Sequence, residues 1–122
     1  MTVQDAIVQI NHLKPNRYDE TTIVEWLSDL DGYIYSEILE WHEGDHKPPL
    51  PYDANQGLEQ VLLVPEPYSD IYIKYLSAQI DYANADFGRY NNSMVMYNMA
   101  LSAFADWYNR THMPKQKSYI KV

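Results

Sequence analysis

The chain lacks several features that would assign it to a common class of protein. Its 122 residues include no cysteine, which excludes disulfides, thiolate nucleophiles and cysteine-ligated zinc and fits a reducing compartment. Its four glycines are too few for a Gly-rich phosphate-binding loop. No apolar run approaches the roughly 18 residues that span a bilayer, and no basic segment precedes the first apolar residues. We therefore expect a cytosolic chain that does not enter a membrane.

Positive charge is also scarce, with nine Lys and Arg against 17 Asp and Glu and a net charge of −8. Tight binding to nucleic acid without sequence preference depends on clustered cations, so this balance argues against a conventional DNA-binding protein. All 17 acids lie in residues 1–112, which carry −11, whereas the three lysines of residues 113–122 make that segment +3. The length suits one domain. We expect a single domain in residues 1–112 and a basic C-terminal tail in residues 113–122.

Tyrosine is the residue in excess, with 12 Tyr and three Trp against two Phe. Tyr and Trp combine a large apolar area with a polar tip, which suits surfaces that are half buried or become buried on association. Two interpretations stay open at this point. The tyrosines either edge a small core or form a self-association surface.

Apolar spacing predicts an all-α bundle of about four helices. Thr2 is the expected N-cap of the first helix, and Pro15 ends it. The second helix starts with Asp19 or Thr22 as its N-cap and extends to about Trp41. Its apolar stripe consists of residues at steps of three and four, namely Ile23, Leu27, Leu30, Ile34 and Ile38.

The third helix is expected to begin near Pro67 and the fourth to start at Asn91 or Asn92, after an interruption at Gly88, and to end near Arg110. Each carries apolar seams at helical spacing. The seam of the third is Ile73, Leu76, Ile80, Ala83 and Phe87, and the fourth has two, namely Met94, Tyr97, Leu101, Phe104, Tyr108 and Met96, Ala100, Ala103, Trp107. Because the fourth helix is apolar on most sides, we expect it to be the central one.

Residues 42–67 form a long loop between the second and third helices, with five of the seven prolines and no sustained period. Such a loop is uncommon in a compact domain and is usually functional or mobile. Its only evident apolar anchors are Leu58 and residues 61–64. We therefore expect it to be partly anchored.

One short motif indicates a catalytic metal. Residues 42–46 read HEGDH, the H-E-x-x-H pattern of zinc hydrolases, in which two histidines one helical turn apart bind the metal beside a glutamate that polarises water. His42, Glu43 and His46 would supply this site. However, Gly44 disfavours a continued helix, and Lys47 directly precedes two prolines. We interpret the segment as a helix C-terminus and expect no metal, cofactor or catalytic residues.

Four carboxylates on the second helix could be imagined as a cluster. Asp29, Asp31, Glu37 and Glu40 do not share one face, so we interpret them as a solvated surface. The three methionines at 94, 96 and 99 are interpreted as core filler.

Several segments resemble a known family. They are LKPNRYDETTIVEWLSDLDGYI (13–34), LLVPEPYSDIYIKYL (62–76), AQIDYANADFGRYNNS (78–93) and AFADWYNRTHMP (103–114). Over roughly residues 2–114 the chain looks like small proteins encoded in the head-morphogenesis region of tailed bacteriophages and of prophages in Gram-positive bacteria.

The resemblance implies a head-tail connector, also called an adaptor or head-completion protein. Such a protein is a small α-helical structural protein that forms a homo-oligomeric ring beneath the portal, closes the DNA-filled head and joins it to the tail. Its partners would be other copies of itself, the portal protein and tail or head-completion proteins. DNA would pass through the ring without sequence-specific binding, and the protein would move from the host cytoplasm into the virion.

Two other functions stay open. One is a zinc-dependent hydrolase that uses the HEGDH motif, and the other is a prophage regulatory or scaffold protein that binds a protein partner. For the connector, we expect the interface to draw on the tyrosine flank, the loop and the basic tail, which we expect to dock as an added strand or extended arm. The candidate residues are Tyr68, Tyr75, Tyr82, Tyr90, Val61, Leu62, Lys115, Lys117, Tyr119, Ile120 and Lys121.

Overall fold

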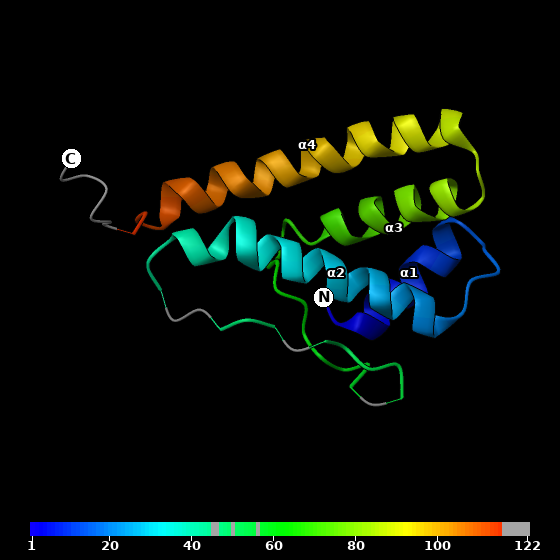
Figure 1. Cartoon of the computed structure of the whole chain (residues 1–122), viewed down its shortest axis with the longest axis horizontal. Helices are drawn as coiled ribbons and strands as arrows, with labels where there is room; N and C mark the ends of the chain where they lie inside the picture. The colour runs from blue at the N-terminus through cyan, green and yellow to red at the C-terminus, as the bar shows by residue number, and fades with distance from the viewer. Residues whose placement is uncertain (45–46, 50, 56, 116–122) are drawn as a thin grey trace.

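The computed structural model describes residues 1–44, 47–49, 51–55 and 57–115 and shows an all-α bundle (Figure 1). This confirms the predicted bundle with one long loop between the second and third helices. The elements are α1 (Val3–Leu13), α2 (Glu20–Glu37), the short 3-10 helix η1 (Leu39–Trp41), α3 (Asp70–Ala83) and α4 (Phe87–Thr111).

Polar side chains at the N-caps set where the helices begin. Thr2 and Asp5 form a capping box on α1, with the Asp5 N–H donating to Thr2 Oγ1 (3.1 Å) and the Thr2 N–H donating to Asp5 Oδ2 (3.0 Å). Of the two predicted N-caps of α2, Asp19 is the one that caps the helix. For α4 the predicted start was wrong, because Asp86 is the N-cap, and Gly88 and the two asparagines after it lie inside the helix.

The prediction that the fourth helix is central was also wrong. Among the helices, α3 contacts α1, α2 and α4, whereas α4 contacts α3 alone (Figure 1). The reason is connectivity, since only residues 84–86 separate α3 from α4, so α4 must return antiparallel beside α3. Because α1 and α2 occupy the other side of α3, the outer face of α4 has no helix against it.

The core lies between α1, α2 and α3, with one seam of α4 added. The seam predicted through Met94, Tyr97 and Phe104 does face inward. The second predicted seam is divided, because Ala100 and Trp107 pack against the core, whereas Met96 and Ala103 are exposed. The largest fully buried side chains are Tyr72, Phe104, Ile10, Ile23, Leu27, Leu30, Ile34, Ile71, Leu76 and Ile80.

The long loop is fastened to the start of α1 by backbone hydrogen bonds. The N–H groups of Val3 and Gln4 donate to the carbonyls of Gln60 (2.9 Å) and Leu58 (2.8 Å). These N–H groups belong to the first turn of α1 and have no acceptor within the helix, so the loop supplies what the helix leaves unpaired. Leu62 and Val64 then enter the core.

A half-buried ion pair joins three helices at the far end of the bundle. Lys14 Nζ donates to both carboxylate oxygens of Asp81 (2.8 Å each), and Ser93 Oγ donates to Asp81 Oδ2 (2.6 Å). Burial raises the pKa of Asp81, but the hydrogen bonds from Lys14 and Ser93 and the nearby positive charges outweigh burial and hold it below its ordinary value. The ionised carboxylate therefore ties the end of α1 to α3 and α4.

We expect the stability that Asp81 contributes to be lost in acid. Because its pKa is lower in the folded than in the unfolded protein, this contribution is present above about pH 4 and disappears as the pH falls through the folded pKa. Urea unfolding of wild type and Asp81→Asn at pH 7 and in acid measures it. The difference in unfolding free energy between wild type and Asp81→Asn should disappear in acid. For exposed Asp70→Asn this difference should be small at both pH values. A difference for Asp81→Asn that does not change with pH would contradict the assignment.

Candidate functional site

The outer face of α4 carries exposed apolar and polar side chains that no other part of the described chain covers. At about 100° per residue, Tyr97, Phe104 and Tyr108 point inward, so the residues opposite them point to solvent. Val95 is 58% exposed and Met99 63%. A shallow hollow on this face is lined by Val95, Asn98, Met99, Ser102, Ala103 and Asp106. We call these six residues, together with exposed Arg110 one helical turn beyond Asp106, the α4 stripe.

The stripe ends in two opposite charges. Asp106 and Arg110 lie one helical turn apart and are both exposed. Between them and the apolar residues stand small side chains, Ser102 and Ala103, which allow another helix to approach closely. The stripe is therefore a helix face with an apolar part, a low centre and a charged end.

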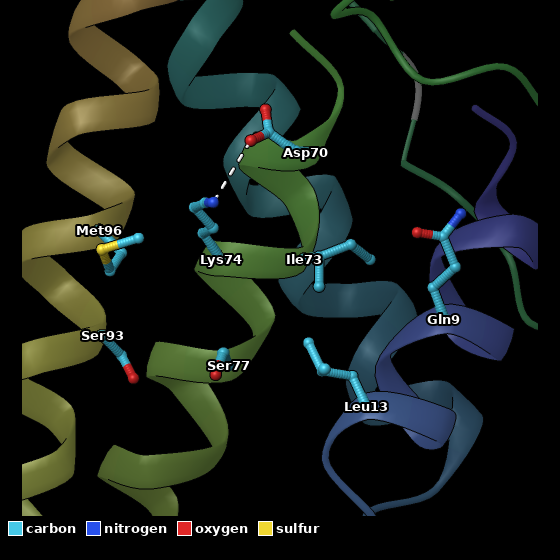
Figure 2. Close-up of a pocket in the computed structure, with 8 residues that line it drawn as sticks. All are labelled: Gln9, Leu13, Asp70, Ile73, Lys74, Ser77, Ser93 and Met96. Carbon is cyan, nitrogen blue, oxygen red and sulfur yellow. Dashed lines mark ion pairs between the residues drawn. The ribbon is translucent and has the colours of Figure 1, made fainter. Parts of the chain in front are cut away.

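A second unfilled surface is a groove of about 300 Å³ along α3. Figure 2 shows α3 between α4 on one side and α1 on the other, with Ile73 and Leu13 turned toward each other across the α1 side. Asp70 and Lys74 form an ion pair of 3.4 Å at one end of the groove. We call this the α3 groove; its lining residues are Gln9, Leu13, Asp70, Ile73, Lys74, Ser77, Ser93 and Met96.

A buried carboxylate lies beneath the long loop, and sequence reasoning had wrongly placed it at the surface. Asp31 is 0% exposed. Its Oδ1 accepts from the Tyr72 hydroxyl (2.5 Å), and its Oδ2 accepts from the Tyr52 hydroxyl (2.5 Å) and the Leu63 N–H (3.1 Å). The carboxylate thus joins α2 and α3 to two points of the loop.

Burial dominates the electrostatics of this Asp31 node. Removal from water raises the pKa of the Asp31 carboxyl, although the hydrogen bonds from Tyr52, Tyr72 and Leu63 oppose the rise. Burial and the adjacent carboxylate raise the pKa of both tyrosines, so both hydroxyls stay protonated as donors. The Tyr72 hydroxyl in turn accepts from the Val64 N–H (2.8 Å). Both carboxylate oxygens and both tyrosine hydroxyls of the node therefore have hydrogen-bond partners.

The first histidine of the HEGDH motif is fully engaged in the fold. His42 is buried, with Nδ1 2.7 Å from the Ile38 carbonyl oxygen and Nε2 2.7 Å from Asn109 Oδ1. A metal could reach neither nitrogen without breaking one of these bonds. Glu43 is exposed, and His46 lies outside the described residues. No group of three or more possible metal ligands occurs within the described ranges.

We expect metal removal to have no effect and His42→Ala to have a clear one. The substitution removes a buried ring together with its hydrogen bonds to the Ile38 carbonyl and the Asn109 side chain, which should cost about 1 to 3 kcal/mol of unfolding free energy. A chelator should leave the melting temperature of the wild type unchanged. Exposed His12→Ala serves as the control for histidine loss. A chelator that destabilises the wild type but not His42→Ala would instead show a structural metal.

Two of the predicted interface tyrosines, Tyr68 and Tyr75, pack against aromatic rings of the same chain. The Tyr68 ring lies 5.2 Å from that of Trp107, and the Tyr75 ring 5.3 Å from that of Tyr97. Both are half-buried. Burial, with the neighbouring hydroxyls of Tyr75 and Tyr33, raises the pKa of Tyr97 to about 12. Tyr68 and Tyr75 therefore join the end of the loop and α3 to α4.

The other candidates fall in separate places. Tyr82 is exposed, and its ring lies 5.2 Å from that of half-buried Tyr90 at the turn between α3 and α4. Val61 is exposed on the loop, whereas Leu62 is 3% exposed and belongs to the core, where a partner cannot reach it. The structure therefore does not bring these residues together into one patch.

The described part of the tail runs beside the end of η1. The Glu43 N–H donates to the Met113 carbonyl (2.8 Å), and the Lys115 N–H donates to the Trp41 carbonyl (3.0 Å), around an antiparallel bridge between His42 and Pro114. The tail thus begins by pairing with its own chain. The remaining tail candidates lie outside the described residues, namely Lys117, Tyr119, Ile120 and Lys121.

Sequence reasoning missed the α4 stripe as a surface because it assigned two of its apolar residues, Met99 and Ala103, to the core. The signal was present, since a helix that is apolar on most sides needs neighbours on all of them.

None of the helices in the described chain is long and apolar enough to cross a membrane. Comparison with protein-family models, curated proteins and solved structures gave no match.

Proposed function

We propose that the protein is a head-tail connector of a tailed bacteriophage or prophage. Copies of it form a ring beneath the portal, close the DNA-filled head and join it to the tail. The proposal starts from the resemblance of residues 2–114 to small proteins of phage head-morphogenesis regions. The structural observation that supports it best is the α4 stripe, with Val95 and Met99 more than half exposed.

An exposed apolar helix face favours association over catalysis. A monomer would gain nothing from leaving this face in water, but a copy that buries it against a neighbour removes apolar area from solvent. In a ring each interface joins one face of a copy to a different face of the next. The chain offers two such faces, the stripe on the outside of α4 and the groove along α3.

The charge of the chain suits a protein through which DNA passes. Residues 1–112 carry −11, so a ring wall built from them repels phosphates, and DNA can slide without being held. In this proposal the protein is made in the bacterial cytoplasm and ends at the head-tail junction of the virion. Its partners are other copies, the portal protein and tail or head-completion proteins.

The decisive experiment is a particle experiment in a phage or prophage that encodes the chain. Deletion of the gene should yield DNA-filled heads without tails, and the wild-type gene supplied in trans should restore infectious particles. Mass spectrometry of purified particles should then find several copies of the chain per virion. Chain that is required in the cell but absent from particles would overturn the proposal and favour a regulatory or scaffold protein.

A matched pair of variants connects this experiment to the stripe. Met99→Asp places a charge on the stripe, and Val8→Asp places one on an exposed apolar residue of α1 with a similar exposed fraction. Both should fold, since both side chains face water. We expect Met99→Asp to fail in trans and Val8→Asp to succeed. Equal success would show that the stripe has no role in the particle.

A further inference from the structure

We infer that the α4 stripe of one copy docks along the α3 groove of the next, antiparallel to α3. This inference deepens the proposed function, on which it rests for the closure of such contacts into a ring. The choice of a second copy as the occupant rests on how the two surfaces match in length, shape and charge.

The two surfaces have the same length. The stripe from Val95 to Arg110 covers 15 helical steps, or about 22 Å, and the 14 residues of α3 extend over about 21 Å. The groove has an apolar floor of Leu13, Ile73 and Met96, of which Leu13 is 66% exposed and Met96 48%. Both surfaces therefore leave apolar area in water over a similar distance.

The charges fix the direction of docking. Asp106 and Arg110 of the stripe lie one turn apart, and so do Asp70 and Lys74 of the groove. If Asp106 meets Lys74 and Arg110 meets Asp70, the incoming α4 runs antiparallel to α3. The ion pair between half-buried Lys74 and exposed Asp70 is 3.4 Å long and reached by water, so exchanging it for pairs across the interface costs little.

This register places the rest of the stripe on the floor of the groove. Seven residues before Asp106, Met99 falls at the level of Asp81 of the neighbour. That level is where α1 ends against α3, because Lys14 is bonded to Asp81. Met99 then lies over Leu13, while the small Ala103 passes the middle of α3.

A symmetric pairing of two stripes fits less well. Two α4 helices that overlap antiparallel over the length of the stripe set Asp106 opposite Met99 of the other copy and Arg110 opposite Val95. A charge that loses water against apolar side chains without a partner is strongly disfavoured. The contact between stripe and groove avoids this and joins two different faces, as a ring requires.

The absence of cysteine makes the pairing directly testable by disulfide trapping. Met99→Cys and Leu13→Cys variants are mixed in equal amounts under mild oxidation, and cross-linked dimer is followed by non-reducing gel electrophoresis. We expect this mixture to form heterodimer at least tenfold faster than a mixture of Met99→Cys with Val8→Cys. Val8 is the matched control, since it is an exposed apolar residue of the same helix as Leu13.

A charge exchange tests the register. Adding Asp106→Lys to the Met99→Cys copy should slow cross-linking to the control rate, and adding Lys74→Glu to the Leu13→Cys copy should restore it. Faster formation of Met99→Cys homodimer than of heterodimer would show that two stripes meet, and equal rates in all mixtures would show no specific contact. Either result overturns the inference.

The trapping result separates this inference from the proposed function. If the heterodimer forms specifically but the chain is absent from virions, the contact between stripe and groove is supported and the connector function is rejected. A chain found in virions whose cross-links do not prefer Leu13 would retain the connector and reject the pairing.

Discussion

Replacement of Asp31 by alanine should lower the unfolding free energy by about 3 to 5 kcal/mol. The substitution removes the acceptor of two tyrosine hydroxyls and of the Leu63 N–H, and each buried donor left unpaired costs about 1 to 3 kcal/mol. It also removes two of the hydrogen bonds that hold the loop to α2. Urea unfolding followed by circular dichroism measures the loss, and the helical content of the folded variant should stay close to that of the wild type.

Asp29→Ala is the matched control for this prediction. It removes the same functional group from the same helix two residues earlier, where the side chain is exposed. Substitutions of this kind usually change stability by about 0.5 kcal/mol or less. Equal losses for the two variants would show that Asp31 contributes through helix charge and not through the node.

Leu76→Ala should cost about 2 to 5 kcal/mol, the range for truncation of a buried leucine. Leu76 is 0% exposed on α3, the helix that contacts the other three, so a cavity there cannot be closed by the movement of one neighbour. Thermal and urea unfolding should show the loss without a change in the denaturant slope, because the fold is retained.

Two substitutions on α4 provide the comparison for Leu76. Leu101→Ala should cost clearly less, because Leu101 is only half-buried, and Met99→Ala should cost about 0.5 kcal/mol or less on the exposed stripe. A loss at Met99 as large as that at Leu76 would mean that the free protein already buries the stripe.

The helices themselves could be predicted because their signals are local. Thr2 and Asp19 cap the first two helices with side chains that the sequence displays, and the apolar steps from Ile23 to Ile34 give the period of α2. The turn at residues 84–86 was harder. Asp86 is a good N-cap, but Gly88 just after it reads as a break, and the helix tolerates that glycine in an exposed first turn.

The buried carboxylate could have been found in the sequence. Asp31 lies four residues after Leu27 and three before Ile34, so it falls on the apolar stripe of α2 and not on its solvated face. What the sequence could not supply is its set of donors. Tyr52, Leu63 and Tyr72 come from the loop and α3, and only the folded chain brings them to one point.

The α4 stripe shows a limit of another kind. Val95 and Met99 look like core residues, and in a monomer considered alone their spacing of four predicts burial. The sequence does not say whether the covering surface belongs to the same copy or to another. That distinction depends on how α1 and α2 fill the space around α3, which local patterns do not determine.

The different lengths of α3 and α4 have a consequence for local opening. Helix α4 has 25 residues and α3 has 14, so the C-terminal end of α4 extends past α3. It packs there against the segment that connects α2 to α3. There Trp107 packs on Tyr68, and Asn109 is bonded to His42. We expect the amide exchange rates of residues 104–111 to depend on the opening of that segment, whereas those of residues 93–101 depend on the opening of α3. Binding of a neighbouring copy to α4 would therefore slow the opening of the connecting segment, which that copy does not contact.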